Sequence, residues 1–377
     1  MRRNHGVASE ARPVVTGRAE EERATMSVSR VSRREFLKAA VVSAASAGVA
    51  VRARRGEAAA GELVVVGWGG AHEESLKKAT YEPFTAATGI RIKQVSATNQ
   101  LAMLKAQVEN NNPEWDIIQP GSAWLYRGAQ EGLYEKVDYG AVERGDMYPP
   151  ALHPHGVAFE VYAVDIVYNA KRFPTGSHPK SWAELWDAKR FPGRRTGPGW
   201  TPRDNFEAAV MAAGVPTSKV YPIDAKLAFA KLADVKPHMT WWQSGAQFAQ
   251  LFADEEVILG YGWGARVVVL AREGKPLAVE LNQAILDQTF FAVSKLSRNK
   301  EAAMKFIAFA SQVKPQAERP LLYPHGPTNR KAWAQLDPKA RRDIVNYDLP
   351  GVLLRNPEWW MDNESALLDQ WKKFLAA

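Results

Sequence analysis

The chain has 377 residues, a formal net charge of +8 and no cysteine. The lack of cysteine excludes structural disulfides, cysteine-ligated metal sites, a cysteine nucleophile and a lipid anchor on an N-terminal cysteine. Of the 49 Lys and Arg residues, 12 lie in the first 60 positions, as do 6 of the 41 Asp and Glu, so residues 61–377 carry a charge of +2. The basic character belongs largely to the first 60 residues, and we expect no nucleic-acid partner.

Those first 60 residues resemble an export signal. Arg33 and Arg34 stand directly before the small, apolar run 39–51, an order that resembles a twin-arginine signal. About 13 residues are too few to cross a hydrocarbon core of roughly 30 Å. We therefore expect residues 1–60 to be an N-terminal extension and a signal peptide cleaved before Gly61, with Met26 as the true start. A basic, disordered tail is the alternative.

The following residues predict an alternation of strands and helices. A β-branched run indicates a buried strand, and Gly89 has the position of a helix C-cap. In chain order, the pattern predicts strand 62–66, helix 74–88, strand 90–95, helix 100–110, strand 115–118 and helix 123–131. Because strand, helix and strand recur, we expect a parallel sheet.

Two long passages, 157–169 and 287–293, are extended and lack a helical period. Between them the pattern predicts helices 205–213, 225–233 and 246–253 and strand 257–261, and after them helix 299–311. About 317 residues exceed what one hydrophobic core serves, so we expect two lobes that these passages join. The predicted boundaries are 61–169 with 285–345 for the first lobe, and 170–284 with 346–377 for the second.

Several segments, in this order, resemble a known family: 66–70, 81–90, 116–118, 166–169 with 179–186, 299–303 and 323–329. They are similar to those of bacterial solute-binding proteins of ABC importers, related to spermidine- and putrescine-binding proteins. The resemblance implies an α/β fold of type II, in which two lobes, each a mainly parallel sheet flanked by helices, are joined by crossing strands. It also implies a periplasmic monomer that carries a small amine to an inner-membrane permease, without a reaction or a cofactor.

In the polyamine-binding members, ammonium groups meet carboxylates and the methylene stem lies between aromatic rings. A cation over an aromatic face gains roughly 0.5 to 2 kcal/mol, and a carboxylate accepts ammonium hydrogen bonds. By position, the resemblance assigns Trp68, Trp124 and Trp263 as the aromatic groups and Asp204 and Asp287 as the acids. Asp204 suits a helix N-cap equally well, whereas Asp287 stands among apolar neighbours, where an unpaired carboxylate is costly.

The chain departs from the polyamine pattern at two positions. The second acid of the family's helix-start pair falls on Thr201, and an aromatic near the later acid falls on Ile285. Fewer acids argue against long triamines and favour a diamine, a monoamine, or a zwitterion whose carboxylate meets Arg203 or Arg266. Ser122, which follows a predicted strand, is a further candidate. The other tryptophans considered are predicted to lie in the core: 182, 186, 241, 333, 359, 360 and 371.

Other functions remain open at this point. A receptor for ferric iron is one, although the sequence lacks adjacent tyrosines and the pair His153 and His155 lies in a proline-rich turn that predicts a solvated loop rather than a metal site. A thiamine receptor would use the same aromatic and acidic groups. A periplasmic hydrolase is disfavoured because the Gly-x-Ser-x-Gly and His-Glu-x-x-His motifs are absent from the sequence.

Overall fold

The computed structural model describes residues 61–174 and 176–377, so the predicted signal peptide and cleavage position lie outside the described residues. The described part begins with three parallel strands, β1 (Glu62–Gly67), β2 (Arg91–Ser96) and β3 (Ile117–Ile118). The helical segments among and after them are α2 (Gly70–Leu76), a π-helical turn (Lys77–Tyr81), α3 (Glu82–Thr88), α4 (Gln100–Glu109) and α5 (Ser122–Gln130). The predicted elements of this half are confirmed.

Gly89 ends α3 as the sequence indicates. Its φ is 75°, in the left-handed region, and its backbone N–H donates to the carbonyl oxygen of Thr85 at 2.8 Å. A residue with a Cβ atom would be strained in this conformation. The chain therefore turns directly into β2.

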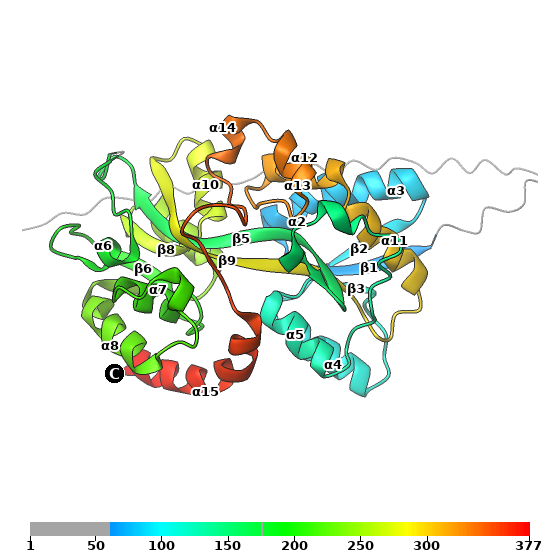
Figure 1. Cartoon of the computed structure of the whole chain (residues 1–377), viewed down its shortest axis with the longest axis horizontal. Coiled ribbons are helices and arrows are strands. Elements are labelled where there is room, and N and C mark those ends of the chain that lie inside the picture. Colours follow the sequence, from blue (N-terminus) through cyan, green and yellow to red (C-terminus); the bar gives the residue numbers. More distant parts are fainter. Residues whose placement is uncertain (1–60, 175) are drawn as a thin grey trace, which may run out of the picture. The chain divides into compact units, whose positions relative to one another are not determined.

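Two long antiparallel strands, β5 (Gly156–Asn169) and β9 (Leu277–Val293), cross the middle of the sheet (Figure 1). The strand order is β2-β1-β3-β9-β5-β8-β6-β7, with β10 (Leu353–Leu354) on β9 and β4 (Leu152–His153) on β5. The predicted passage 287–293 is only the end of β9, because pairing with the second half of β5 extends it back to Leu277. The sheet is thus mixed: the crossing strands are antiparallel, and parallel strands lie on either side.

The other side of the sheet contains β6 (Arg195–Pro198), β7 (Met239–Trp242) and β8 (Leu259–Trp263), which run parallel to one another. Its helices are α6 (Trp182–Trp186), α7 (Asn205–Ala212), α8 (Ala225–Val235), α9 (Gly245–Ala253) and α10 (Ala265–Arg272). The chain continues after β9 with α11 (Lys300–Ala310), α12 (Val313–Leu322), α13 (Arg330–Gln335), α14 (Pro338–Arg341) and α15 (Pro357–Ala376). The predicted helices are confirmed within a few residues, whereas β6, β7, α10 and α12 to α15 were not predicted.

Two large apolar cores lie along the crossing strands. One contains Val157 of β5 and Phe291 of β9 and is shared with β1, β3 and α11. The other contains Val164 of β5 and Ile285 of β9 and is shared with α6, α7, α8 and α15. Four of the tryptophans predicted to lie in the core are buried, namely 182, 186, 360 and 371. Each crossing strand therefore belongs to both cores.

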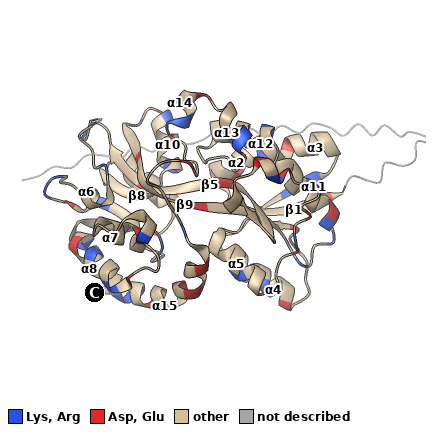
Figure 2. Cartoon of the chain, in the orientation of Figure 1, with Lys and Arg blue, Asp and Glu red and all other residues tan. Residues whose placement is uncertain are grey.

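Charged residues of both signs are interspersed over the helices, and acidic residues also occur within β5 and β9 (Figure 2). Glu160 and Asp165 of β5 and Asp287 of β9 are at most 4% exposed. Among the helices of residues 61–174 and 176–377, none combines the length and the apolar character that a membrane span requires. A buried carboxylate needs a partner. Glu160 and Asp287 have such partners, whereas Oδ1 of Asp165 has none among the described residues.

Candidate functional site

Trp68 and Trp124 come together at the carboxyl ends of two neighbouring parallel strands. Trp68 follows β1, and Trp124 lies in the first turn of α5, after β3. Their ring centroids are 5.7 Å apart with planes at 31°, and the Trp68 Nε1–H donates to the carbonyl of Gln119 at 3.1 Å. Both side chains remain partly exposed. The structure thus brings these two predicted residues together at the edge of the sheet where ligands bind in open α/β folds.

A second aromatic pair follows the parallel strands on the other side. Trp263 ends β8, and its ring centroid lies 6.0 Å from that of Trp200, which follows β6 and was not predicted. The guanidinium carbon of Arg266 is 5.7 Å from the centroid of the Trp263 ring. Two predicted residues, Trp263 and Arg266, are therefore in contact through a cation–π arrangement.

Strand register places Asp287 and Trp263 on one face of the sheet. Asp287 of β9 pairs with Tyr162 of β5, and Trp263 of β8 pairs with Val164, two residues further along β5. Paired residues point to the same face, and so do residues two apart along a strand. Asp287, Tyr162 and Trp263 consequently project together, separated along β5 by roughly 7 Å.

Asp287 is 1% exposed and has protein partners at both carboxylate oxygens. Oδ1 accepts from the Ser122 hydroxyl at 2.5 Å and from the backbone N–H of Gln288 at 2.7 Å. Oδ2 accepts from the Tyr162 hydroxyl at 3.1 Å and from Arg355 Nη1 at 3.0 Å. The sequence indicated that this acid needs a partner, and that partner is Arg355, together with the predicted Ser122.

Arg355 also binds two acids at the start of α7. Its Nη2 is 2.5 Å from Asp204 Oδ1, and its Nε and Nη2 donate to the two oxygens of Glu207 at 2.9 and 2.8 Å. We call Asp204, Glu207, Asp287 and Arg355 the carboxylate cluster. All four residues are at most 5% exposed, so three acids share one guanidinium away from water.

The three acids differ in how fully they are used. Glu207 also accepts from the hydroxyl of Tyr221, from Trp360 Nε1 at 2.8 Å and from the backbone N–H of Asp204 at 3.1 Å. Burial opposes its ionisation, but Arg355 lowers the pKa of Glu207 overall. Asp204 is engaged by Arg355 through Oδ1, and burial, with Glu207 nearby, raises its pKa. Of these two acids, Asp204 is the one whose ionised form the protein favours less.

Asp204 also begins a helix, as the alternative interpretation proposed. It is the N-cap residue of α7 and has φ 69° and ψ −41°, a conformation rarely adopted by residues other than glycine. Strained backbone of this kind costs about 1 to 3 kcal/mol and is found preferentially at functional sites. The capping position and the carboxylate cluster therefore coincide at one residue.

The remaining predicted residues, Thr201 and Arg203, lie beside α15. Arg203 Nε is 2.8 Å from Glu364 Oε1, and the Thr201 hydroxyl is 3.4 Å from the same oxygen. Glu207 is a second acid at this helix start, and it was not predicted. A sequence signal for Glu207 existed, because an acid three residues after an N-cap Asp is typical of a capping box. Arg355 has no such signal, since it is an isolated arginine far away in the sequence.

A second buried acid, Glu160, joins elements of the other core. His72 Nε2 lies 3.0 Å from Oε1, and His325 Nδ1 lies 2.8 Å from Oε2. Two histidines and a carboxylate form a donor set that can hold a divalent metal. Here, however, Oε1 also accepts a hydrogen bond from Thr289 Oγ1 at 2.6 Å, and Oε2 forms an ion pair with Arg319 Nη2 at 2.5 Å. We interpret the group as a polar junction between α2, β5, β9 and α12.

This junction predicts a pH-dependent stability. Burial lowers the pKa of His325 to about 4, despite the adjacent Glu160 carboxylate. Below about pH 6.5 the unfolded chain takes up a proton at this residue and the folded chain does not, so stability falls as pH falls towards 4. We expect a loss of about 2 kcal/mol between pH 7 and pH 5 from this residue, measured by urea unfolding.

The matched variants are His325→Gln and His238→Gln. The first should reduce the difference between the two pH values, whereas the second, at an exposed histidine, should keep the wild-type difference. An identical pH dependence in His325→Gln and wild type would contradict the assignment.

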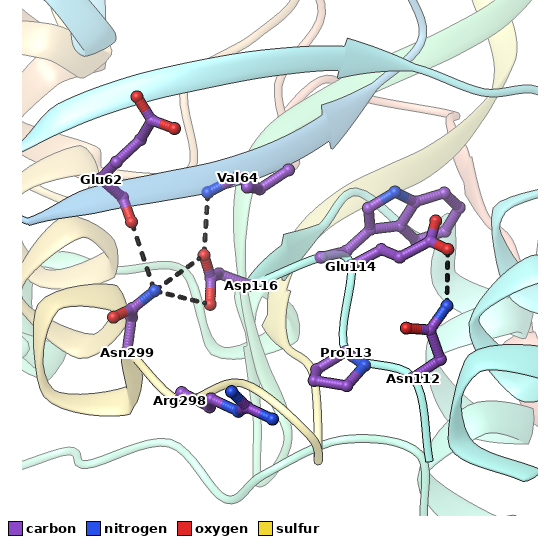
Figure 3. Close-up of a pocket in the computed structure, with 9 residues that line it drawn as sticks. Glu62, Val64, Asn112, Pro113, Glu114, Asp116, Arg298 and Asn299 are labelled. Atoms are coloured by element: carbon purple, nitrogen blue, oxygen red, sulfur yellow. Dashed lines mark hydrogen bonds between the residues drawn. The ribbon is translucent and has the colours of Figure 1, made fainter. Parts of the chain in front are cut away.

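The structure also has a pocket of about 380 Å³ at the opposite ends of the strands (Figure 3). It lies at the amino end of β1, where Asp116 accepts from the Val64 N–H at 2.9 Å and from Asn299 Nδ2 at 3.2 Å. Ligands in open α/β sheets bind at the carboxyl ends of the strands. We therefore place the candidate site at the tryptophan pairs and the carboxylate cluster, and not in this pocket.

Comparison with known proteins relates the chain to binding proteins. Residues 79–343 match the family described as bacterial extracellular solute-binding proteins. The chain is 30% identical over 323 residues to the gamma-aminobutyric acid-binding protein of Pseudomonas aeruginosa, covering 83% of this chain and 91% of that protein. It is 22% identical over 306 residues to spermidine/putrescine-binding periplasmic protein 1 of Haemophilus influenzae, covering 76% and 81%.

The fold is similar to solved structures as well. An ABC transporter substrate-binding protein from Bradyrhizobium japonicum superposes with a TM-score of 0.79 at 34% identity, covering 84% of this chain and 99% of that one. The predicted two-lobed periplasmic-binding-protein fold is thereby confirmed. These relatives are solute-binding proteins of ABC transporters and not enzymes.

Proposed function

The chain belongs to the family of bacterial extracellular solute-binding proteins, which bind small molecules and deliver them to ABC permeases, and we propose that its ligand is a small amino acid with separated charges. Such a ligand, of which 4-aminobutyrate is an example, carries one ammonium group and one carboxylate. The relative named as a gamma-aminobutyric acid-binding protein supports this choice, whereas the polyamine-binding relative is more distant. Thiamine and ferric iron remain the alternatives to be tested.

The observation that carries the proposal is the carboxylate cluster, in which three buried acids share one guanidinium. A ligand ammonium beside Asp204 would supply positive charge where the protein leaves an excess of negative charge. Ser122, which binds Asp287, lies on the same turn of α5 as Trp124. The aromatic pair of Trp68 and Trp124 is therefore available for the methylene stem or the cation.

Arg266 is our candidate for the carboxylate of the ligand. Arg203 is already paired with Glu364, whereas Arg266 makes no ion pair with any residue that the structure describes. A guanidinium binds a carboxylate with two parallel hydrogen bonds. Arg266 and Asp204 would thus bind the two ends of a zwitterion.

Replacing Arg266 with Gln should weaken binding of 4-aminobutyrate by about 10-fold or more, because a charged hydrogen bond contributes about 1.5 to 3 kcal/mol. Binding of n-butylamine, which has no carboxylate, should be unchanged. Titration calorimetry of both ligands checks this. Arg272→Gln, at the other end of α10, is the matched control, since Arg272 is bonded to the carbonyl of Leu321 instead. Equal weakening of both ligands would exclude Arg266 as the carboxylate partner.

The lobes that we propose are residues 61–169 with 285–345 and residues 170–284 with 346–377. The first contains one of the two cores, and the second contains most of the other, to which Val164 and Ile285 of the crossing strands also belong. Under this division, Arg127 of α5 and the Met361 carbonyl of α15, which form a hydrogen bond, belong to different lobes. Contacts that a ligand makes to both lobes would favour the closed state, which the permease then recognises. We further propose export to the periplasm through the twin-arginine signal, and action as a monomer.

The test is the melting temperature of residues 61–377 with 4-aminobutyrate, n-butylamine, butyrate, putrescine, thiamine, ferric citrate and a neutral sugar. A ligand at 100 times its dissociation constant adds about 2.7 kcal/mol of stability. We expect the largest rise with 4-aminobutyrate and smaller rises with the compounds that carry only one of its charges. A rise with iron, thiamine or sugar, and none with the amino acid, would overturn the ligand class.

A further inference from the structure

We propose that Arg355 determines ligand specificity, because its guanidinium occupies the place that a second ligand ammonium would take and so restricts the site to monoamines. The inference rests on the proposed function and goes beyond it, since it assigns the discrimination between an amino acid and a diamine to one side chain of the protein.

The hydrogen-bond acceptors of Arg355 are the three acids of the carboxylate cluster. Arg355 donates to Asp287 Oδ2 at 3.0 Å, to Asp204 Oδ1 at 2.5 Å and to both oxygens of Glu207 at 2.9 and 2.8 Å. An alkylammonium likewise carries one positive charge and several N–H donors. An ammonium group at this place would therefore meet the same three acids.

The positive charge of Arg355 disfavours a second ammonium group in the site. With Arg355 in place, Glu207 and Asp287 are held by the protein, and Asp204 is the acid with acceptor capacity left for a ligand. A second ammonium would have to be buried beside a guanidinium that already occupies the cluster, and like charges in a dry site repel strongly. A single ammonium avoids this contact.

The backbone around Arg355 holds its side chain in this position. Arg355 follows β10, which pairs with β9 so that Leu353 lies opposite Ile285 and Leu354 opposite Leu286. The Arg355 backbone N–H donates to the Leu286 carbonyl at 2.9 Å, and the side chain is 3% exposed. The strand pairing thus holds the guanidinium beside Asp287. Arg355 is part of the framework of the site and does not need a ligand to be in place.

The test compares binding of 4-aminobutyrate and putrescine to the wild type and to Arg355→Gln by titration calorimetry. The wild type should prefer 4-aminobutyrate by at least about 100-fold, and Arg355→Gln should reduce this preference by at least about 10-fold through a gain in putrescine affinity. Two control variants test whether the charge of Arg355 causes the discrimination. Arg355→Lys keeps the positive charge and should still exclude putrescine, and the double variant Arg355→Gln/Glu207→Gln restores the charge balance and should lose the gained affinity.

Because Arg355→Gln leaves three buried acids without a cation, its unfolding midpoint is measured as well, with and without putrescine. Putrescine should raise the midpoint of this variant more than n-butylamine does, and more than it raises that of the wild type. Any one of three results would overturn the inference. They are an unchanged preference in Arg355→Gln, a wild type that binds putrescine as tightly as 4-aminobutyrate, and no selective stabilisation by putrescine. A wild type that binds no amino compound is a different result, which overturns the proposed function itself.

Discussion

Replacing Asp204 with Asn should weaken binding of 4-aminobutyrate by about 10- to 100-fold while the protein remains folded, because a hydrogen bond to a charged group contributes about 1.5 to 3 kcal/mol. Asn has the size and shape of Asp and is as good an N-cap, so we expect it to keep the backbone conformation of this position. The substitution therefore removes the charge and keeps the backbone. Calorimetry gives the affinity, and thermal unfolding should show a change of only a few degrees.

Two further variants locate the effect. Asp287→Asn removes a charge from the same cluster, but Asp287 is occupied by Ser122, Gln288, Tyr162 and Arg355, so we expect a smaller loss of affinity. Asp116→Asn changes a buried acid in the pocket of Figure 3, at the other ends of the strands, and should leave the affinity unchanged. If Asp204→Asn binds 4-aminobutyrate as tightly as the wild type, Asp204 is a helix cap and does not contact the ligand.

Replacing Glu160 with Gln should lower the free energy of unfolding by about 3 to 5 kcal/mol, because it leaves the buried Arg319 without its counter-charge. Arg319 and Glu160 are 4% and 1% exposed at their side chains, and their closest atoms are 2.5 Å apart. Gln also replaces one acceptor oxygen by an NH2 group with two donors, at a position that accepts from Thr289, His72 and His325. Urea unfolding at pH 7 measures the loss.

Glu280→Gln is the matched control for this prediction. Glu280 also pairs with a histidine, His178, at 2.9 Å, but its side chain is 22% exposed. A partly exposed pair contributes less than a fully buried one, so the control should lose less stability than Glu160→Gln. A similar loss in both variants would show that the Glu160 junction adds nothing beyond a partly exposed ion pair.

The site could be predicted from the sequence where its residues follow strands. Trp68, Trp124 and Trp263 were placed in loops after predicted strands, and the structure brings Trp68 and Trp124 together and sets Trp263 beside the predicted Arg266. Asp287 was recognised because a carboxylate among apolar residues requires a partner. Glu207 lies three residues after Asp204, a spacing that is equally typical of a capping box, so the sequence alone does not distinguish a site acid from a helix cap.

Local sequence patterns determined the elements of the first half, such as the strand at 62–66 and the helix end at Gly89, because β-branched runs and glycine act through the backbone of neighbouring residues. The family resemblance in the sequence also implied the two-lobed fold. Tertiary structure alone decided that Arg355, which is 68 positions from Asp287 in the chain, neutralises it. A buried charge is compensated by whichever group the fold brings within hydrogen-bonding distance, and no local pattern records that distance.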